Sequence, residues 1–336
     1  MDKDTKVTAA IIGLGRWGQN LVDSTKADPE NGLLFTHAMT RTKSKVVEYC
    51  IKNSLTLADN FEDILNNDAI EAVVLATPHS QHCNQIKAAA AAGKHVFVEK
   101  PYTLSLKDGI DAATACKDSG VELAVGFNRR FLPAYNQLEE LLVSKKLGTA
   151  LHIEGNFSGS FGYNYTADMW RGSNEENPAG GMGAMGIHIL DLMVHLLGTV
   201  KTVMAYSSRR VVTSLVDDTT TALIEFTSGA TASLTTMTAT SPTWKMHLYG
   251  SKGSAFLPNQ HSLEVNVINT ETEKTSFEIV DTLAIELDTF AQSVRGRCVY
   301  PVKISEALAG VSTMESIAKA AKTGAKTSVN SNFSGF

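Results

Sequence analysis

A glycine-rich segment near the amino terminus constrains the fold of this 336-residue chain more than any other feature. Gly13, Gly15 and Gly18 directly follow a short apolar run, Val7–Ile12, and open a helical pattern. In such a turn the first glycine permits a tight bend, the second lets a pyrophosphate approach the backbone, and the third lets the helix pack on the strand. The helix amino terminus then faces the anion. The segment predicts dinucleotide binding, the alternative being a glycine-rich turn without a ligand.

Short apolar runs alternate with helical patterns from about residue 6 to residue 128. One helical pattern, over residues 84–92, is followed by Gly93, which is typical of a helix carboxyl end. Runs without an exposed face are typical of parallel strands covered by helices on both sides. The predicted strands are Val7–Ile12, Leu33–Met39, Ala72–Ala76, His95–Val98 and Leu123–Val125. This part of the chain is predicted to be an α/β Rossmann domain with a doubly wound parallel sheet.

The pattern changes after about residue 128, where closely spaced strands joined by Ser and Gly turns predict a mostly antiparallel sheet. The predicted strands cover residues 151–157, 201–209, 219–226, 230–238, 244–249, 253–257 and 263–268. Helices are expected over residues 133–146, 183–197, 281–295 and 305–322. We therefore predict a second α/β domain, with residues 1–127 forming the first domain and residues 128–336 the second.

Composition and charge exclude several classes of protein. A hydrophobic fraction of 43% with 19% charged residues is typical of a soluble globular protein. The net charge of -5 disfavours binding to nucleic acid. No cysteines stand at disulfide-framework or zinc-ligand spacing, which indicates a reducing compartment. Residues 1–6 do not resemble a signal peptide and no apolar run approaches the ~18 residues of a membrane span, so we expect no membrane association and a cytoplasmic location.

The residues after the second predicted strand bear on the choice between NAD and NADP. Sites for NAD place an acid near this point to bind the ribose 2'-hydroxyl. Here Thr40 and Arg41 are followed by Lys43, and no acid is present. Cationic and hydroxyl side chains suit a 2'-phosphate, so we expect a preference for NADP, with NAD as the alternative. A solvated basic start of a helix is the interpretation without a ligand.

Two further motifs follow predicted parallel strands, at the carboxyl ends where doubly wound folds bind their ligands. The first spans residues 76–82 and the second is Glu99–Lys100–Pro101. Together with the glycine segment and the second strand they supply the expected dinucleotide contacts. These are Gly13, Gly15, Arg16, Trp17, Gly18, Thr40, Arg41, Ala76, Thr77, Pro78, His79, His82, Glu99 and Lys100.

In combination with three later motifs, these segments resemble the Gfo/Idh/MocA oxidoreductases. The later motifs are Gly126–Arg130, Gly180–Gly181 ahead of Gly186–Asp191, and Asp217–Thr219. The resemblance runs nearly end to end and implies a Rossmann domain followed by an α/β domain with a large open sheet. It also implies a homodimer or homotetramer, assembled partly through that sheet, that binds a small molecule. The implied reaction is reversible hydride transfer between nicotinamide and a carbinol carbon of a sugar, cyclic polyol or related ring diol, with an aromatic cis-dihydrodiol as an alternative substrate.

The resemblance assigns catalytic roles to Lys100 and His188. Lys100 matches the family lysine at the reacting carbinol, and in a dry cleft beside an oxidised nicotinamide it would have a lowered pKa and exchange a proton with the substrate oxygen. His188 matches the histidine that binds or deprotonates the hydroxyl. The alternatives are a surface lysine at a strand end and a core histidine bonded to backbone.

Expected substrate contacts surround these two residues. Asp191 and His195 share a helical face with His188, and Asp191 is expected to bind a substrate hydroxyl or to orient a neighbour, whereas His195 is expected to be structural. A loop rich in aromatic residues, 161–171, suits a sugar or diol ring, the alternative being a packing or interface loop. The remaining expected contacts are Asn128, Arg129, Tyr163, Trp170 and Arg171.

One position departs from the family pattern. The family often carries an aspartate four residues before the histidine, where this chain has Ala184. Alanine neither accepts a proton nor orients a lysine, so Lys100 and His188 suffice, another acid such as Asp191 substitutes, or the site does not catalyse. The last case corresponds to a non-catalytic NADP-binding sensor or regulator of the same fold. The retained Lys100 and His188 favour the enzyme, because a sensor has no use for them.

Overall fold

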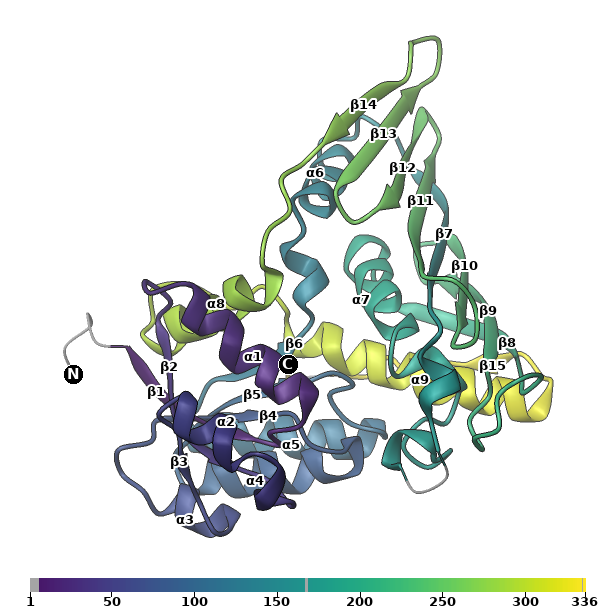
Figure 1. Ribbon diagram of the computed structural model, residues 1–336. Helices are drawn as coiled ribbons and strands as arrows, with labels where there is room; N and C mark the ends of the chain where they lie inside the picture. The colour runs from purple at the N-terminus through teal and green to yellow at the C-terminus, as the bar shows by residue number, and fades with distance from the viewer. Residues whose placement is uncertain (1–5, 167–168, 334) are drawn as a thin grey trace. The chain divides into compact units, whose positions relative to one another are not determined.

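The computed structural model describes residues 6–166, 169–333 and 335–336, and its chain divides into two compact units (Figure 1). Unit 1 comprises Met1–Thr103, Lys107–Asn128 and Asp281–Ile304, and unit 2 comprises Leu104–Leu106, Arg129–Val280 and Ser305–Phe336. The expected division between residues 127 and 128 stays a prediction, because the units are defined by contacts and unit 1 includes a segment from much later in the chain.

Unit 1 contains a six-stranded parallel sheet with the order β3-β2-β1-β4-β5-β6. Its strands are β1 Val7–Ile12, β2 Leu33–Met39, β3 Thr56–Leu57, β4 Ala72–Leu75, β5 His95–Glu99 and β6 Leu123–Gly126. Every residue of β4 and β6 is buried, as expected for strands covered on both faces. The predicted Rossmann sheet is confirmed. The two-residue β3 was not predicted, because it is too short to carry a periodic pattern.

The helices of unit 1 include one from the distant segment of the chain. They are α1 Arg16–Ala27, α2 Val47–Lys52, α3 Phe61–Leu65, α4 His82–Ala91, α5 Leu106–Ser119 and α8 Thr282–Val294. Helix α8 packs against α1 and β2. The Asn31 amide donates to the Ala284 carbonyl at 2.9 Å, and the Gly32 N–H donates to the Asp288 carboxylate at 2.7 Å. These bonds explain why α8 belongs to unit 1.

A bidentate ion pair joins the end of α8 to the amino-terminal edge of this sheet. Arg295 binds both carboxylate oxygens of Glu71, Nη1 to Oε1 at 2.7 Å and Nη2 to Oε2 at 2.9 Å. The backbone N–H of Thr8 also donates to Oε2, at 3.0 Å. Hydrogen bonding from Arg295 lowers the pKa of Glu71 to about 2, despite the opposing effect of partial burial.

Unit 2 contains a nine-stranded sheet with the order β14-β13-β12-β11-β7-β10-β9-β8-β15. Its strands are β7 Ala150–Ser158, β8 Val200–Ser208, β9 Thr219–Phe226, β10 Thr231–Met237, β11 Thr243–Gly250, β12 Gly253–Asn259, β13 Ser262–Val267, β14 Glu273–Ser276 and β15 Thr327–Ser328. Strands β7 and β10 are parallel, and the other neighbouring pairs in the described part of the sheet are antiparallel. The predicted mostly antiparallel sheet is confirmed.

Two strands of this sheet and two helix starts differ from prediction. The exposed β14 and the short β15 show no alternation of apolar residues, so no pattern indicated them. Helix α7 covers Gly186–Leu197 rather than starting at residue 183, because residues 183–185 form a turn. Helix α4 starts at His82 rather than residue 84, and Gly93 follows it with a φ of 70°, as its expected capping role requires.

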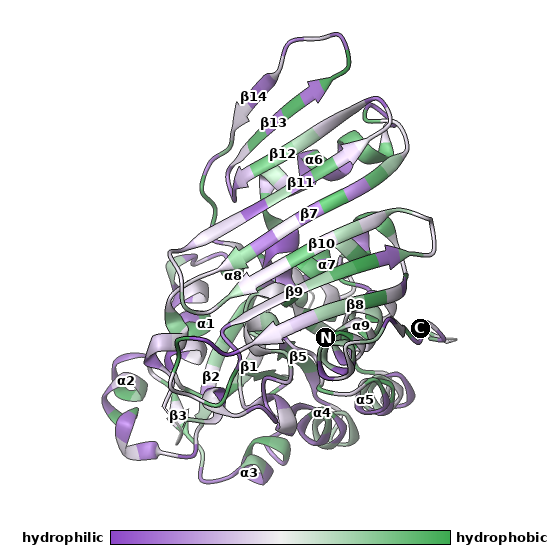
Figure 2. Ribbon diagram, turned by 90° about the vertical axis from the view of Figure 1, so that its right-hand side faces the viewer, coloured by the Kyte–Doolittle hydropathy of each residue, from purple (hydrophilic) through white to green (hydrophobic). Residues whose placement is uncertain are grey.

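Helix α7 lies against the sheet of unit 2 at a position where glycine is required. It packs on β7 and β10, and unit 2 also contains α6 Pro133–Val143 and nearly all of α9 Ile304–Thr323. A Cβ atom on Gly155 of β7 would lie 2.2 Å from Ile189 and 2.8 Å from Met193 of α7. Along β9 buried residues alternate with more exposed ones, and Figure 2 shows this sheet coloured by hydropathy. One sheet face is therefore covered and the other is open.

Within the described residues, no helix combines the length and the apolar character needed to cross a membrane.

We expect Glu71→Gln to destabilise unit 1 in a pH-dependent way. Because the pKa of Glu71 is lowered from 4.5 to about 2, its charge stabilises the fold fully above about pH 5 and progressively less as the pH falls through 4.5 toward 2. Allowing for partial exposure, we expect a loss of about 2 kcal/mol at pH 7, and about half of that at pH 3. Denaturant unfolding at both pH values measures this difference.

Glu62→Gln, at an exposed position of α3, is the matched control and should change stability little at either pH. An equal loss for Glu71→Gln at pH 7 and pH 3 would contradict the role of its charge.

Candidate functional site

The glycine segment brings the carboxyl ends of three strands of unit 1 together. Gly13 has a φ of 97°, and its N–H donates to the Met39 carbonyl at the end of β2, at 2.8 Å. A Cβ atom on Gly13 would lie 2.5 Å from the Ala76 carbonyl oxygen after β4. On Gly18, a Cβ atom would lie 2.2 Å from the Gly13 carbonyl oxygen. The first and third glycines therefore have the steric roles that the motif predicts.

Gly15 has a different environment, which suits a ligand. It is the N-cap residue of α1, and among the described residues no atom beyond its own chain neighbours lies within 4 Å of the position of a Cβ atom. No side chain caps this helix end and its first turn has no acid, so the helix itself supplies no counter-charge to the positive end of its dipole. The side chains of Arg16 and Trp17 follow directly, and the buried Trp17 Nε1 has no hydrogen-bond partner within the described residues. These features fit the pyrophosphate of a dinucleotide.

The residues after β2 distinguish the predicted cations. Thr40 is half-buried and Arg41 is exposed, one and two residues beyond the Met39 carbonyl that binds Gly13. Lys43 forms an ion pair with Asp59, which lowers the pKa of that carboxyl. Because Lys43 already has an anionic partner, Arg41 is the better candidate to bind a 2'-phosphate.

His82 links the loops that follow β4 and β5. Its side chain is fully buried, with Nδ1 3.0 Å from the Pro101 carbonyl oxygen and Nε2 3.2 Å from the Thr77 carbonyl oxygen. His79, 9% exposed, makes an edge contact with the His82 ring. The structure thus places His82 where it shapes the two loops, and its predicted contact with a dinucleotide stays a prediction.

These two loops carry the other predicted contacts of this edge. Residues 76–78 follow β4 and are half-buried, and the Thr77 hydroxyl donates to Gln85 at 2.6 Å. Lys100 follows β5, is half-buried, and is joined to Pro101 by a cis peptide bond. The expected sites for the pyrophosphate and for Lys100 therefore share the carboxyl edge of one parallel sheet.

The remaining predicted residues of unit 1 are tied into its structure. Glu99 is 5% exposed, and a Cβ atom on Gly126 of β6 would lie 3.2 Å from its Oε1. The Asn128 amide is buried and donates to the Thr282 hydroxyl at 2.9 Å, at the start of α8. The Tyr300 hydroxyl donates to the Val125 carbonyl at 3.2 Å. Hydrogen bonds from Asn128 to Thr282 of α8, and to Val125 from Tyr300, which follows α8, therefore hold residues 125–128 in place.

In unit 2, the His188 side chain of α7 and the Arg129 side chain both contact the ring of Phe157. His188 is 5% exposed, and its ring centroid lies 5.8 Å from that of Phe157, at the end of β7. The Arg129 Cζ lies 5.7 Å from the centroid of the same Phe157 ring. The structure therefore brings the predicted Arg129 and His188 to one aromatic ring. Phe157 was not predicted as a site residue, although its position at the last residue of a predicted strand was a usable signal.

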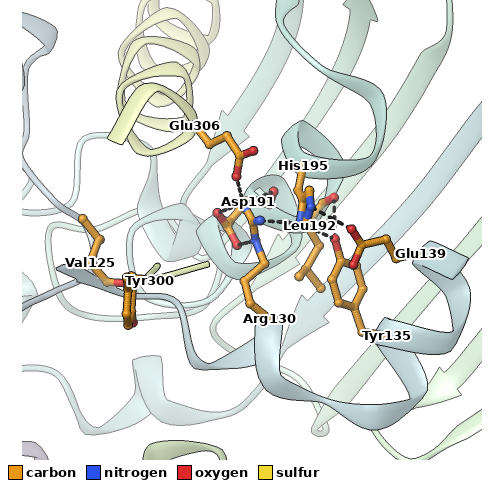
Figure 3. A network of polar contacts seen from close by, with 9 residues as sticks. All are labelled: Val125, Arg130, Tyr135, Glu139, Asp191, Leu192, His195, Tyr300 and Glu306. Carbon is orange, nitrogen blue, oxygen red and sulfur yellow. Dashed lines mark hydrogen bonds and ion pairs between the residues drawn. The ribbon is translucent and has the colours of Figure 1, made fainter. Parts of the chain in front are cut away.

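Asp191 and His195 belong to a buried network centred on Arg130 (Figure 3). Arg130 Nε lies 2.6 Å from Asp191 Oδ2 and Nη2 lies 2.8 Å from Oδ1, and Asp191 is 3% exposed. Arg130 also binds Glu306 at 2.9 Å and the Nδ1 atom of His195. Both carboxylate oxygens of Asp191 thus hold an arginine, and His195 is structural in this network. The contacts of Arg130 with Asp191, His195 and Glu306 could not be predicted from the spacing of these residues in the sequence.

The aromatic-rich loop is exposed and partly preorganised. Tyr163 is 60% exposed, and its hydroxyl donates to the Ala239 carbonyl at 3.3 Å. The Arg171 Cζ stacks 4.1 Å from the Trp170 ring centroid. Residues 167–168 of this loop lie outside the described residues. Ala184 lies in the turn before α7 and provides no acid there.

The two predicted catalytic residues belong to different units, Lys100 to unit 1 and His188 to unit 2. Each has its own setting, a sheet edge with the features of a dinucleotide site and a helix beside an aromatic ring. Among the described residues, no group of three or more histidine, cysteine, aspartate or glutamate side chains is placed to hold a metal ion.

Comparisons with known proteins agree with this arrangement. Scyllo-inositol 2-dehydrogenase (NAD(+)) of Bacillus subtilis is 28% identical over 312 residues, which is 86% of this chain and 86% of that protein. D-xylose 1-dehydrogenase (NADP(+)) 2 of Haloferax volcanii is 27% identical over 277 residues, 80% of this chain and 84% of that protein. The structure of aldose-aldose oxidoreductase from Caulobacter crescentus has the same fold, with a TM-score of 0.86 at 21% identity over 96% of this chain and 100% of that one.

Two family models match consecutive parts of the sequence. Residues 7–127 match the oxidoreductase family with an NAD-binding Rossmann fold, and residues 135–256 match the GFO/IDH/MocA C-terminal domain. The predicted nicotinamide dinucleotide and oxidoreductase class are confirmed at the level of this family. The chain therefore belongs to the Gfo/Idh/MocA oxidoreductases, and it has the glycine segment and the large second sheet that this family implies.

Proposed function

We propose that this protein is an NAD(P)-dependent dehydrogenase that interconverts a secondary alcohol and a ketone on a sugar, cyclic polyol or related ring diol. The observation that carries the proposal is the position of Lys100 after β5, on the sheet edge where the Gly15 helix end is open to an anion. An amine at this edge is placed to exchange a proton with a substrate beside a bound dinucleotide.

Oxidation of an alcohol removes a hydride from carbon and a proton from oxygen, and the dinucleotide when bound accepts the hydride. The remaining task of the protein is to receive the proton and to orient the hydroxyl. We assign the proton to the Nζ atom of Lys100 and assign His188 to the hydroxyl as a hydrogen-bond partner and second acid or base. Asp191 does not replace the aspartate missing at Ala184, because it already binds Arg130 through both carboxylate oxygens. Lys100 and His188 therefore act as a pair.

The proposed substrate class rests on the loop of unit 2 and on the relatives. Trp170 stacked by Arg171, together with Tyr163 and Arg129, presents ring faces and hydrogen-bond donors that suit a polyhydroxylated ring. Asn128 completes the proposed set. The named inositol and xylose dehydrogenases among the relatives act on compounds of this kind. An aromatic cis-dihydrodiol remains the alternative substrate.

NADP is the proposed preferred cofactor, with NAD as the alternative. Arg41 is exposed beside the glycine turn, and no acid stands at the residues directly after β2. Relatives include enzymes named for NAD and for NADP, so membership of the family does not decide the preference, and the proposal rests on the residues after β2 in this chain.

We also propose a homodimer or homotetramer formed through the open face of the unit 2 sheet. Met204 of β8 lies opposite Leu223 of β9, and these side chains are 48% and 56% exposed. Tyr206 of β8 is 73% exposed. Burying such side chains against a second copy is favourable. The four free cysteines fit a reducing compartment such as the cytoplasm.

Lys100→Met should abolish turnover and leave dinucleotide binding nearly intact, because the thioether side chain keeps the bulk but cannot carry a proton. Nicotinamide absorbance in the presence of monosaccharides, cyclic polyols, sugar acids and dihydrodiols measures turnover, with NADP and with NAD. We expect a loss of 10²-fold or more in kcat. Lys87→Met, at an exposed position of α4, is the control.

Full activity of Lys100→Met would refute the proposed mechanism. Tight NADPH binding without turnover of any substrate by the unmodified protein would instead favour the non-catalytic sensor, with Ala184 as its structural basis.

Arg41→Ala should weaken NADP binding by about 10-fold or more and NAD binding little, since a charge-assisted contact to the 2'-phosphate is lost. Titration of intrinsic fluorescence with each dinucleotide measures the two dissociation constants. Lys52→Ala, an exposed cation at the end of α2, should change neither. Equal weakening of both dinucleotides by Arg41→Ala would remove the argument for a 2'-phosphate site.

A further inference from the structure

The network around Arg130 is fully contained in unit 2 and joins three helices. Arg130 precedes α6, Asp191 and His195 lie on α7, and Glu306 lies in the first turn of α9. The Arg130 side chain is 2% exposed, and its guanidinium contacts all three partners. A buried cation with so many directed contacts has one arrangement, because each displaced contact leaves a buried charge or a buried acceptor without its donor.

Hydrogen-bond chemistry fixes the protonation of His195 in this network. Arginine only donates, so the Nδ1 atom of His195 that faces Arg130 is the acceptor and carries no proton. The ring proton therefore lies on Nε2, which is 3.1 Å from the Glu139 carboxylate on α6. Burial and the Arg130 charge lower the pKa of His195, in agreement with a neutral ring. Arg130 therefore makes two contacts with α7, an ion pair with Asp191 and a hydrogen bond to the neutral His195 ring.

The two contacts of Arg130 on α7 are placed to fix the rotation of this helix. Asp191 and His195 are one turn apart, and His188 lies one turn before Asp191 on the same helical face. A helix held at two successive turns cannot rotate without breaking the bidentate pair. Any rotation of α7 would carry the His188 ring away from Phe157, which lies on β7.

Arg129, adjacent to Arg130 in the chain, contacts the ring of Phe157 on β7. Its Cζ lies 5.7 Å from the Phe157 ring that also faces His188. The ion pair between Arg130 and Asp191 therefore fixes the backbone next to Arg129, and it also fixes helix α7, which carries His188. Two residues of the proposed substrate site thus depend on one buried ion pair.

We propose that Arg130 is a positioning residue, which holds His188 and Arg129 in register through its ion pair with Asp191. The proposal rests on the proposed function of His188. It gives Asp191 an indirect role, through Arg130, in place of direct binding to the substrate. The ion pair sets the geometry in which His188 meets the substrate hydroxyl, and small displacements of such a group lower turnover strongly.

The test replaces the whole pair, because removing one partner would leave a buried charge. Arg130→Met with Asp191→Leu substitutes two apolar side chains for the ion pair, an exchange that buried pairs often tolerate without loss of stability. We expect a folded protein with unchanged dinucleotide affinity and a kcat lowered by ~10- to 100-fold, with a smaller change in KM. The matched control is Arg295→Met with Glu71→Leu, which removes the bidentate pair of unit 1 and should keep kcat within about 2-fold.

The single variant Arg130→Lys keeps the charge and loses the fork geometry. We expect an intermediate loss of kcat, about 3- to 10-fold, and this variant decides the question if the double variant does not fold. An unchanged kcat in whichever variant folds would overturn the proposal. A raised KM with unchanged kcat would also overturn it, because Asp191 would then bind the substrate directly.

A readout without turnover separates this proposal from the proposed function. Nitrogen-15 spectra of the histidine rings report the environment of His188 and the tautomer of His195. In the double variant we expect the His188 signal to shift or broaden. The His195 Nδ1 signal should shift as its contact with Arg130 is lost, while Tyr135 and Glu139 remain next to the ring. Unchanged histidine signals overturn the positioning role even if the unmodified protein turns over no substrate, a result that by itself refutes only the proposed function.

Discussion

The close approach of backbone to backbone at the glycine turn is the constraint on which unit 1 depends. Gly13 and Gly18 leave no room for side chains, so β1, β2 and β4 end side by side at one edge. Gly15 differs from both, because its surroundings are open. Within six residues, glycine thus serves two purposes, close packing of the fold at two positions and room for a ligand at the third. The loops with Arg41, Thr77 and Lys100 then reach the same edge without any further adjustment.

A similar approach shapes unit 2, where Gly155 lets α7 contact the sheet. The helix is held from the opposite direction by Arg130, which binds Asp191 and His195. Steric contact sets the distance of α7 from the sheet, and the ion pair sets its rotation. His188 is placed by the combination, since neither constraint alone defines the direction of its ring. The buried ion pair between Arg130 and Asp191 serves to orient α7 rather than to stabilise the fold, because buried ion pairs contribute little stability once the cost of desolvation is included.

Much of this architecture could be predicted from local patterns. The glycine motif, the buried strands and the alternating strands of the second sheet all follow from periodicity and turn residues, and the structure confirms both sheets. The short β3 and β15 and the exposed β14 were missed because they carry no pattern. The contacts of Arg130 with Asp191 and Glu306 join residues far apart in sequence, and no spacing rule encodes them. The bonds of His82 to the loops after β4 and β5 show the same limit, since its motif gave no indication of them, and its contact with a dinucleotide stays a prediction.

The place of α8 in unit 1 has a consequence for the synthesis of the chain. Strands β1 to β6 leave the ribosome early, whereas the helix that packs on α1 and β2 follows only after residue 281. Until then the apolar surface under α8 is exposed, and most of unit 2 has already been made. The nascent Rossmann unit therefore waits for more than 150 intervening residues, from Arg129 to Val280, before its last helix docks. Complete folding of unit 1 is thereby tied to the synthesis of residues 129–280, which belong to unit 2.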